Sequence, residues 1–207
     1  MRIGIINYGM GNLASVKRAL EEIDAAAFIA EVPASLADAD RVVLPGVGAF
    51  PAAMHNLEHQ GWREALHHAV REREKPLLGI CLGMQLLASF GEEGTPTAGL
   101  GFIEGTVRRL DAVGCSLRVP HVGWNELIHA DADPLFAHIP QRSDFYFVHS
   151  YVFTPDAPRN IVGTTEYGVP VVAAVRQGNI WGVQFHPEKS SRAGRQLLKN
   201  FVDYAPC

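Results

Sequence analysis

The 207-residue sequence contains only three cysteines, Cys81, Cys115 and Cys207, and none of them forms a CxxC pair. An odd number of cysteines without Cys/His clusters at zinc spacing argues against a disulfide framework and against a structural zinc site. Charged residues make up only 19% of the chain, the formal net charge is -4, and there is no run of lysines or arginines. Neither nucleic acid nor an anionic membrane is therefore expected as the main partner.

Long apolar segments are also missing. No stretch is long enough to span a bilayer, and the N-terminus enters an apolar strand without the apolar core and cleavage site of a secretory signal. We therefore expect a reducing, cytoplasmic location. Hydrophobic residues make up 47% of the chain, which suffices for a sizeable core. The length corresponds to about one large domain.

The first part of the chain alternates apolar runs with helical patterns. Strands are predicted over residues 2–6, 26–30, 41–44 and 77–80, and helical patterns over residues 12–24, 52–74 and after residue 81. Such alternation indicates βαβ crossovers and a mostly parallel sheet that is covered on both faces.

Past residue 91 the pattern changes, because turn residues rather than helices separate the apolar runs. Short strands are predicted over residues 106–110, 117–122, 144–153, 161–166, 171–176 and 180–185, followed by a helix over residues 192–204. This spacing favours antiparallel or mixed pairing. The sequence thus predicts one α/β domain with a strand-rich second half.

Cys81 stands between a predicted buried strand and a predicted helix, flanked by Gly79 and Gly83. This is the G-x-S-x-G nucleophile elbow with sulfur in place of oxygen. A helix N-terminus at this point would favour a thiolate and then an oxyanion. The alternative is a small buried cysteine beside a tight turn, which is the commoner role of a free cysteine.

His186 follows another predicted strand, and Glu188 lies two residues further on. Side chains at i and i+2 of an extended chain point the same way, and Pro187 favours the extended form at His186. Glu188 can therefore hold one ring nitrogen while the other faces outward, which is the base that a cysteine nucleophile needs. On its own the tripeptide would more often be a surface turn. Cys115 and Cys207 have no such context and are not expected to be catalytic.

Two glycine-rich loops follow predicted strands. Pro45-Gly-Val-Gly48 can form an anion nest or be a simple turn. The segment Gly9-Met-Gly-Asn-Leu-Ala14 matches the dinucleotide-binding pattern G-x-G-x-x-A, with Glu31 about 20 residues on. Its alternatives are a tight turn with an N-cap at Asn12 and a polar loop that contacts a partner or substrate.

Together these motifs resemble those of the triad-type (class I) glutamine amidotransferases. Gly79-Ile-Cys-Leu-Gly-Met-Gln85 resembles the nucleophile motif of that family, His186-Pro-Glu188 its base motif, and Pro45-Gly-Val-Gly48 its oxyanion loop. The resemblance covers essentially the whole chain, residues 1–207, as a single amidotransferase domain. It implies a three-layer, flavodoxin-like α/β fold whose central sheet is mostly parallel, with antiparallel additions in the second half.

The resemblance also implies a reaction. L-glutamine would be hydrolysed to glutamate and ammonia through a glutamyl-thioester, with Cys81 as nucleophile, His186 as acid and base, and Glu188 orienting His186. No cofactor and no metal are implied. The implied oxyanion hole consists of Val47, Gly48 and Leu82, and the implied glutamine-binding residues are Gly46, Gln85, Glu104, His149, Ser150 and Tyr151. The alternative for Glu104 is an ordinary exposed carboxylate on a strand.

Within the family, the resemblance is to glutaminase subunits that pass ammonia to a (β/α)₈-barrel cyclase in a heterodimer of histidine biosynthesis. It is carried by Asn7-Tyr-Gly-Met-Gly-Asn12, Pro120-His-Val-Gly-Trp-Asn125, Tyr146-Phe-Val-His-Ser-Tyr151 and His186-Pro-Glu-Lys-Ser190. It implies that Asn12, Trp124, Asn125, Tyr146 and Lys189 lie at or near the subunit interface or the ammonia exit. Trp124 could instead be a core tryptophan. The alternatives are a class I amidotransferase that supplies ammonia to another acceptor, a related Cys-His hydrolase, and a non-enzymatic nucleotide-binding module.

Overall fold

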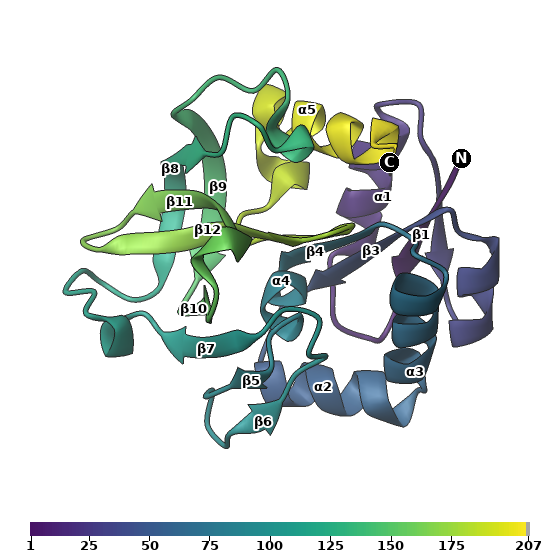
Figure 1. Ribbon diagram of the computed structural model, residues 1–207, viewed down its shortest axis with the longest axis horizontal. Helices are drawn as coiled ribbons and strands as arrows, with labels where there is room; N and C mark the ends of the chain where they lie inside the picture. Colours follow the sequence, from purple (N-terminus) through teal and green to yellow (C-terminus); the bar gives the residue numbers. More distant parts are fainter. Residues whose placement is uncertain (206–207) are drawn as a thin grey trace.

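The computed structural model describes residues 1–205, so that Cys207 lies outside the described part. A nine-stranded sheet runs through the molecule (Figure 1). Its strand order is β2 (Ala26–Ala30), β1 (Arg2–Ile6), β3 (Arg41–Gly46), β4 (Leu77–Cys81), β13 (Ile180–Val183), β12 (Pro170–Gln177), β11 (Ile161–Glu166), β8 (His121–His129) and β9 (Ser143–His149).

This sheet has a parallel half and an antiparallel half. The strands from β2 to β13 pair in parallel, and those from β13 to β9 pair antiparallel. All residues of β3 and β4 are buried, as expected for strands with helices on both sides. The α/β class and the antiparallel second half are confirmed, whereas "mostly parallel" holds for the first half of the sheet only.

A second sheet of four strands lies beside the first. Its order is β10 (Tyr151–Pro155), β7 (Gly105–Arg109), β5 (Phe90–Gly91) and β6 (Thr97–Ala98). The single strand predicted over residues 144–153 is therefore wrong, because the chain leaves one sheet for the other at Ser150. The strand predicted over 117–122 instead begins at His121, after Pro120, and extends to His129. A proline cannot donate to a strand ladder.

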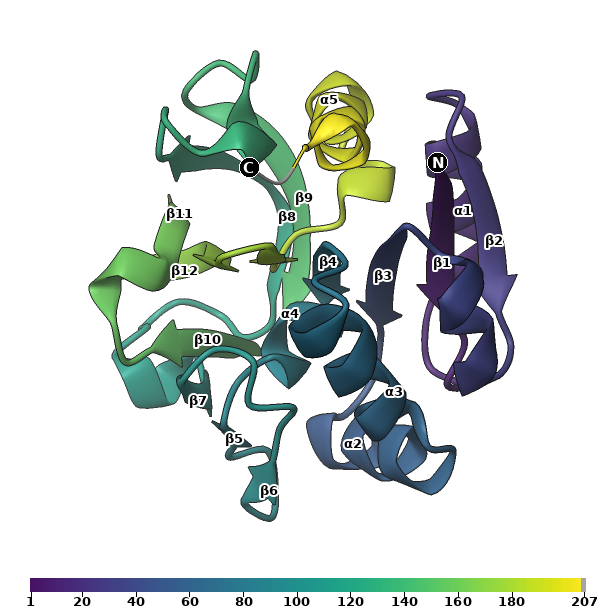
Figure 2. The same ribbon diagram turned by 45° about the vertical axis from the view of Figure 1, so that its right-hand side comes forward.

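Helices cover both faces of the large sheet (Figure 2). α1 (Leu13–Glu21) and α5 (Ser191–Asp203) pack on one face, with α2 (Phe50–His59), α3 (Trp62–His67) and α4 (Leu82–Leu86) on the other. The helical pattern over residues 52–74 is divided at Gly61, whose φ of 75° is left-handed, and it ends in a π-helical segment, His68–Glu72. Short 3-10 turns are Pro33–Asp38, Asp111–Val113, Pro134–Phe136, Pro158–Asn160 and Pro187–Lys189.

Two large apolar clusters, one on each face of the sheet, form the core. None of the helices within residues 1–205 combines the length and the apolar character that a bilayer crossing requires. The carboxyl ends of β3, β4 and β13 lie side by side, because β3 and β13 each pair in parallel with β4. Ligand sites of such sheets lie at these strand ends.

Candidate active site

Cys81 ends β4 and directly precedes α4, with φ 56° and ψ −111°. A non-glycine residue at positive φ is strained and persists only where its surroundings hold it. The flanking glycines make the turn possible. A Cβ on Gly83 would lie 1.8 Å from the carbonyl oxygen of Leu44, and one on Gly79 would lie 2.6 Å from the carbonyl oxygen of Gly83. The G-x-C-x-G spacing is thus required by close backbone contacts.

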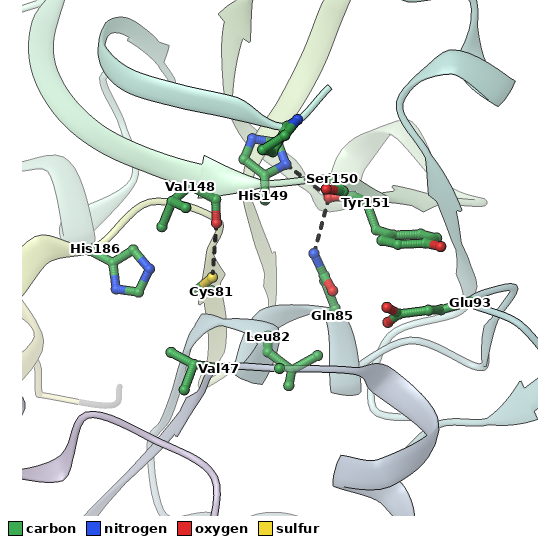
Figure 3. Close-up of a pocket in the computed structure, with 12 residues that line it drawn as sticks. Val47, Cys81, Leu82, Gln85, Glu93, Val148, His149, Ser150, Tyr151 and His186 are labelled. Atoms are coloured by element: carbon green, nitrogen blue, oxygen red, sulfur yellow. Dashed lines mark hydrogen bonds between the residues drawn. The ribbon is translucent and has the colours of Figure 1, made fainter. Parts of the chain in front are cut away.

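A pocket of about 390 Å³ opens over Cys81 (Figure 3), within the range of small-molecule sites. Residues from several loops and strand ends line it: Val47, Gly48, Cys81, Leu82, Gln85, Glu93, Pro120, Val148, His149, Ser150, Tyr151 and His186. Sγ of Cys81 lies 3.8 Å from the carbonyl oxygen of Val148. Cys115, which is also buried, is not among the lining residues.

His186 and Glu188 form a buried pair at the edge of this pocket. Nδ1 of His186 lies 2.7 Å from Oε1 of Glu188, and their side chains are 3% and 1% exposed. Within residues 1–205, the other ring nitrogen, Nε2, has no hydrogen-bond partner, and the ring lies beside Cys81 in Figure 3. Burial lowers the pKa of His186, but the proximity and charge of Cys81 and the hydrogen bond and charge of Glu188 outweigh burial and raise the pKa to about 9.

Backbone contacts hold the turn that carries this pair. The amide of His186 donates to the carbonyl oxygen of Tyr146 at 2.9 Å. The Ser190 hydroxyl accepts from the amide of Tyr146 at 3.0 Å and donates to the carbonyl oxygen of His186 at 2.6 Å. The end of β13 is therefore fixed against β9, and the imidazole is fixed relative to the pocket.

The residues expected for the oxyanion hole meet at one side of the pocket. Val47 and Gly48 follow β3, and Leu82 follows Cys81 at the start of α4. Gly48 has a φ of 114°, which favours glycine. Gly46, expected to bind substrate, is not a lining residue. It lies within β3 opposite Cys81, and a Cβ there would be 2.6 Å from the hydroxyl of Tyr8.

Of the other expected substrate-binding residues, Gln85, His149, Ser150 and Tyr151 line the pocket. Glu104 does not. It is exposed and precedes β7 at the end that pairs with Pro155, whereas Tyr151 pairs with the opposite end of β7. The carboxylate that lines the pocket is that of half-buried Glu93, which accepts from the amide of Phe50 at 2.7 Å. Glu93, Pro120 and Val148 were missed from sequence.

Comparison with known proteins decides the family. The model of the family described as glutamine amidotransferase class-I matches residues 4–204. The chain belongs to this family. It is 49% identical over 199 residues to the imidazole glycerol phosphate synthase subunit HisH of Moorella thermoacetica, covering 96% of this chain and 93% of that protein. It is 43% identical over 212 residues to HisH of Nitrosomonas europaea, covering 99% of both.

Solved structures agree on the fold of this glutamine amidotransferase. A structure of PurLQS from Thermotoga maritima superposes with a TM-score of 0.76 at 19% identity, covering 98% of both chains. Another, described as a glutamine amidotransferase, gives 0.75 at 22% identity, covering 97% of this chain and 98% of that chain. At such identities the likeness concerns the fold alone, and it confirms the predicted class I amidotransferase fold.

A second pair of histidines, His121 and His149, lies at the wall of the amidotransferase pocket, and His149 lines the pocket itself. His149 Nε2 is 3.0 Å from Nδ1 of His121, and His149 Nδ1 is 2.8 Å from the carbonyl oxygen of Tyr151. Burial lowers the pKa of His121 to about 4. Burial also lowers the pKa of His149 to about 3, although its bond to Tyr151 acts in the other direction. Both rings are therefore neutral at physiological pH.

The residues expected at the partner interface lie mainly on β8 and β9. Trp124 is 52% exposed, so the core alternative is wrong. It lies opposite Tyr146 across the strand pair, with ring centroids 6.0 Å apart, and Nζ of Lys189 lies 5.6 Å from the centroid of Tyr146. Asn125 is half-buried, whereas Asn12 is exposed and its side chain accepts from the amide of Ser15, as predicted for an N-cap.

The loop that matched the dinucleotide pattern is a tight turn before α1. Gly9 has a φ of 88°, and its amide donates to Oδ1 of Asn7. Nδ2 of Asn7 donates to Glu31 at 2.6 Å, so this carboxylate, which follows β2, binds the side chain at the start of the turn. The turn-and-cap interpretation accounts for the segment, and the family match favours the amidotransferase over the nucleotide-binding module.

Proposed function

We propose that the protein is the glutaminase subunit of an imidazole glycerol phosphate synthase and acts in L-histidine biosynthesis in the cytoplasm. It hydrolyses L-glutamine and passes the ammonia to the cyclase subunit HisF, a (β/α)₈ barrel and its partner in a heterodimer. The products there are imidazole glycerol phosphate and aminoimidazole carboxamide ribotide. The observation that carries the hydrolytic role is the buried His186–Glu188 pair beside Cys81. The names of the HisH relatives support the pathway.

In the first half-reaction, the Cys81 thiolate attacks the side-chain amide carbon of glutamine. The raised pKa of His186 keeps its ring protonated at neutral pH, so that Nε2 can deliver a proton to the leaving nitrogen. The C–N bond breaks, ammonia leaves, and a C–S bond joins the glutamyl group to Cys81. Glu188 holds Nδ1 and stabilises the imidazolium, which a thiolate nucleophile requires.

In the second half-reaction, water hydrolyses the glutamyl-thioester. His186 has lost its proton to ammonia, so Nε2 accepts one from the attacking water. The C–S bond breaks, glutamate leaves, and the thiolate and imidazolium form again. The amides of Leu82 and of Val47 or Gly48 would stabilise the tetrahedral oxyanion of both steps, and losing one such donor costs about 10²–10³ in kcat.

The walls of the pocket supply groups for the amino-acid part of glutamine. Among the described lining residues, Glu93 is the only carboxylate, and it suits the α-ammonium by charge. We assign it the role that the sequence resemblance gave to Glu104. Gln85 and the segment 149–151 also line the pocket.

The exposed face of β8 and β9 is the proposed docking face for the cyclase. Val122 pairs with Val148 and Trp124 pairs with Tyr146 across the two strands, and Val122, Trp124 and Val148 are 55%, 52% and 36% exposed. Contiguous exposed apolar side chains with a central aromatic residue are typical of interfaces. Val148 also lines the pocket, so ammonia would form beside this face.

A glutaminase assay with and without HisF and its ribulose-phosphate ligand tests the proposal. We expect slow hydrolysis by the isolated chain and a large acceleration in the presence of the liganded cyclase. Full activity without a partner would contradict the coupled-subunit role. Acceleration by the cyclase of another pathway, but not by HisF, would assign the protein to a different acceptor.

A further inference from the structure

Two chains of hydrogen bonds meet at the main-chain oxygen of Tyr151, on the wall of the pocket (Figure 3). Nδ1 of His149 lies 2.8 Å from this oxygen, and Nε2 of Gln85 lies 3.0 Å from it. A carbonyl oxygen has two lone pairs and accepts from both groups. Tyr151 is also the first residue of β10, so this oxygen links the four-stranded sheet to the side chains of His149 and Gln85.

The first chain runs from Tyr151 toward the proposed docking face. Nε2 of His149 lies 3.0 Å from Nδ1 of His121, and Nε2 of His121 lies 3.3 Å from Nδ2 of Asn125. The same Nδ2 donates to the carbonyl oxygen of Glu166 at 2.8 Å. His121 and His149 are direct partners in the register of β8 and β9.

The direction of each bond in this chain is fixed. Because the carbonyl oxygen only accepts, Nδ1 of His149 carries a hydrogen and Nε2 of that neutral ring accepts from Nδ1 of His121. Nε2 of His121 in turn accepts from the amide of Asn125. Each ring therefore holds one proton, in agreement with the neutral state that burial imposes on both. The ring of His121 is also clamped by stacking on Phe147 and Tyr167.

The second chain runs from Tyr151 to the nucleophile. Nε2 of Gln85 also lies 2.9 Å from Oε1 of Gln184, and Nε2 of Gln184 lies 3.8 Å from Sγ of Cys81. Gln184 is wholly buried. An unbroken series of neutral groups thus connects Asn125 to the sulfur of Cys81.

We propose that His121 is a positioning residue that couples docking of the cyclase at Trp124 and Asn125 to the Tyr151 wall of the pocket and, through Gln85 and Gln184, to Cys81. The inference rests on the proposed function. Trp124 and Asn125 are adjacent on β8. A partner that shifts the exposed indole of Trp124 therefore also shifts Asn125, whose side-chain amide binds His121. Buried hydrogen-bonded groups cannot lose one partner without cost, so the shift is passed along the chain.

Two variants break the chain on opposite sides of His121. In His121→Asn, the shorter amide can keep the bond to His149 but not the contact with Asn125. In His121→Gln, the longer amide can keep the contact with Asn125 but not the bond to His149. With saturating cyclase and its ligand, we expect both variants to lower the ratio of stimulated to basal glutaminase activity at least about tenfold. The KM for glutamine should rise in the Gln variant only.

His129→Asn is the matched control. His129 is a second buried histidine on β8, but its Nε2 binds the carbonyl oxygen of Ile139 and it does not line the pocket. Its stimulation ratio should equal that of the unchanged protein, whatever its thermal unfolding midpoint. An equal fall in this control would indicate general loosening of β8 and overturn the inference.

The remaining outcomes separate this inference from the proposed function. If the unchanged protein is not stimulated by the cyclase, the proposed function fails first. If it is stimulated and both His121 variants are stimulated equally, only the coupling through His121 is overturned. A loss confined to the Gln variant would mean local support of the pocket wall, which also contradicts the coupling.

Discussion

His186 and His149 line the same pocket and are both buried, yet their protonation states are opposite. His186 is next to Cys81 and Glu188, which raise its pKa to about 9 against the effect of burial. His149 has only a carbonyl oxygen and another histidine as partners, so burial lowers its pKa to about 3. Burial alone therefore does not set the role of a histidine, whereas its partners do. One ring is equipped to move a proton, and the other to hold a fixed pattern of hydrogen bonds.

Removing the thiol of Cys81 should have the largest effect on activity, and it should change the protonation of His186 but not that of His149. In Cys81→Ala, glutamine-dependent synthesis by the complex should fall by at least about 10⁴-fold, because no thioester can form. Synthesis from free ammonia should persist. In the same variant the pKa of His186, followed by the NMR signals of its ring, should fall while that of His149 stays. Equal loss of both syntheses would contradict the role of Cys81.

Removing the carboxylate should have the next largest effect. Glu188→Gln leaves His186 without the charge that helps to raise its pKa, so the ring should lose its proton at lower pH. By analogy with other triads, kcat should fall by about 10²–10⁴. The alkaline limb of the profile of kcat/KM against pH should shift to lower pH. An unchanged profile would mean that Glu188 does not set the state of His186.

A smaller effect on activity is expected from a substitution at the pocket wall that leaves the hydrogen-bond partners of His186 and His149 unchanged. Glu93→Gln should raise the KM for glutamine about 10- to 100-fold, the cost of a lost charge-assisted hydrogen bond, with little change in kcat. Glu104→Gln is the control, since Glu104 is exposed and does not line the pocket. A larger effect of the Glu104 substitution would show that Glu104, as expected from the sequence, and not Glu93 binds glutamine.

The smallest effect concerns stability, and it has opposite signs for the two kinds of histidine. Between pH 6.5 and 9 the native state keeps a proton on His186 that the unfolded chain has released, so stability falls as pH rises. Below pH 6.5, His121 and His149 bind protons in the unfolded chain but stay neutral in the native state. Stability therefore falls as pH drops toward 4. Each group contributes a slope of about 1.4 kcal/mol per pH unit.

Denaturant unfolding at a series of pH values measures these slopes. His186→Asn should flatten the decline above pH 6.5, and His121→Asn should flatten the decline between about pH 5 and 6.5, where most carboxylates are already ionised. Identical slopes in both variants and the unchanged protein would contradict the opposite protonation states.

Local patterns predicted one kind of histidine and not the other. The elbow around Cys81 and the tripeptide from His186 to Glu188 are each contained within a few residues, so backbone geometry could be inferred from sequence. His121 and His149 are 28 residues apart, and their pairing depends on the register of two strands, which composition and periodicity do not contain.

Two errors of the sequence-based prediction, Glu104 in place of Glu93 and a single strand over residues 144–153, have the same cause. Glu93 lies in a turn-rich segment whose course is set by contact with α2, through its bond to the amide of Phe50. The run from 144 to 153 is uniformly strand-like, and only the competition between two sheets divides it at Ser150. Tertiary pairing decided both cases, whereas the order of strands and helices in the first half followed from hydrophobic pattern alone.

The account depends most on Cys81 as the nucleophile that receives the glutamyl group. Rapid acid quenching of the liganded complex during turnover of L-glutamine, followed by mass spectrometry of its peptides, tests this directly. We predict one glutamyl group on the peptide that contains Cys81 and none on the peptide that contains Cys115. Turnover without any acylated Cys81, or with the glutamyl group on another residue, would contradict the account.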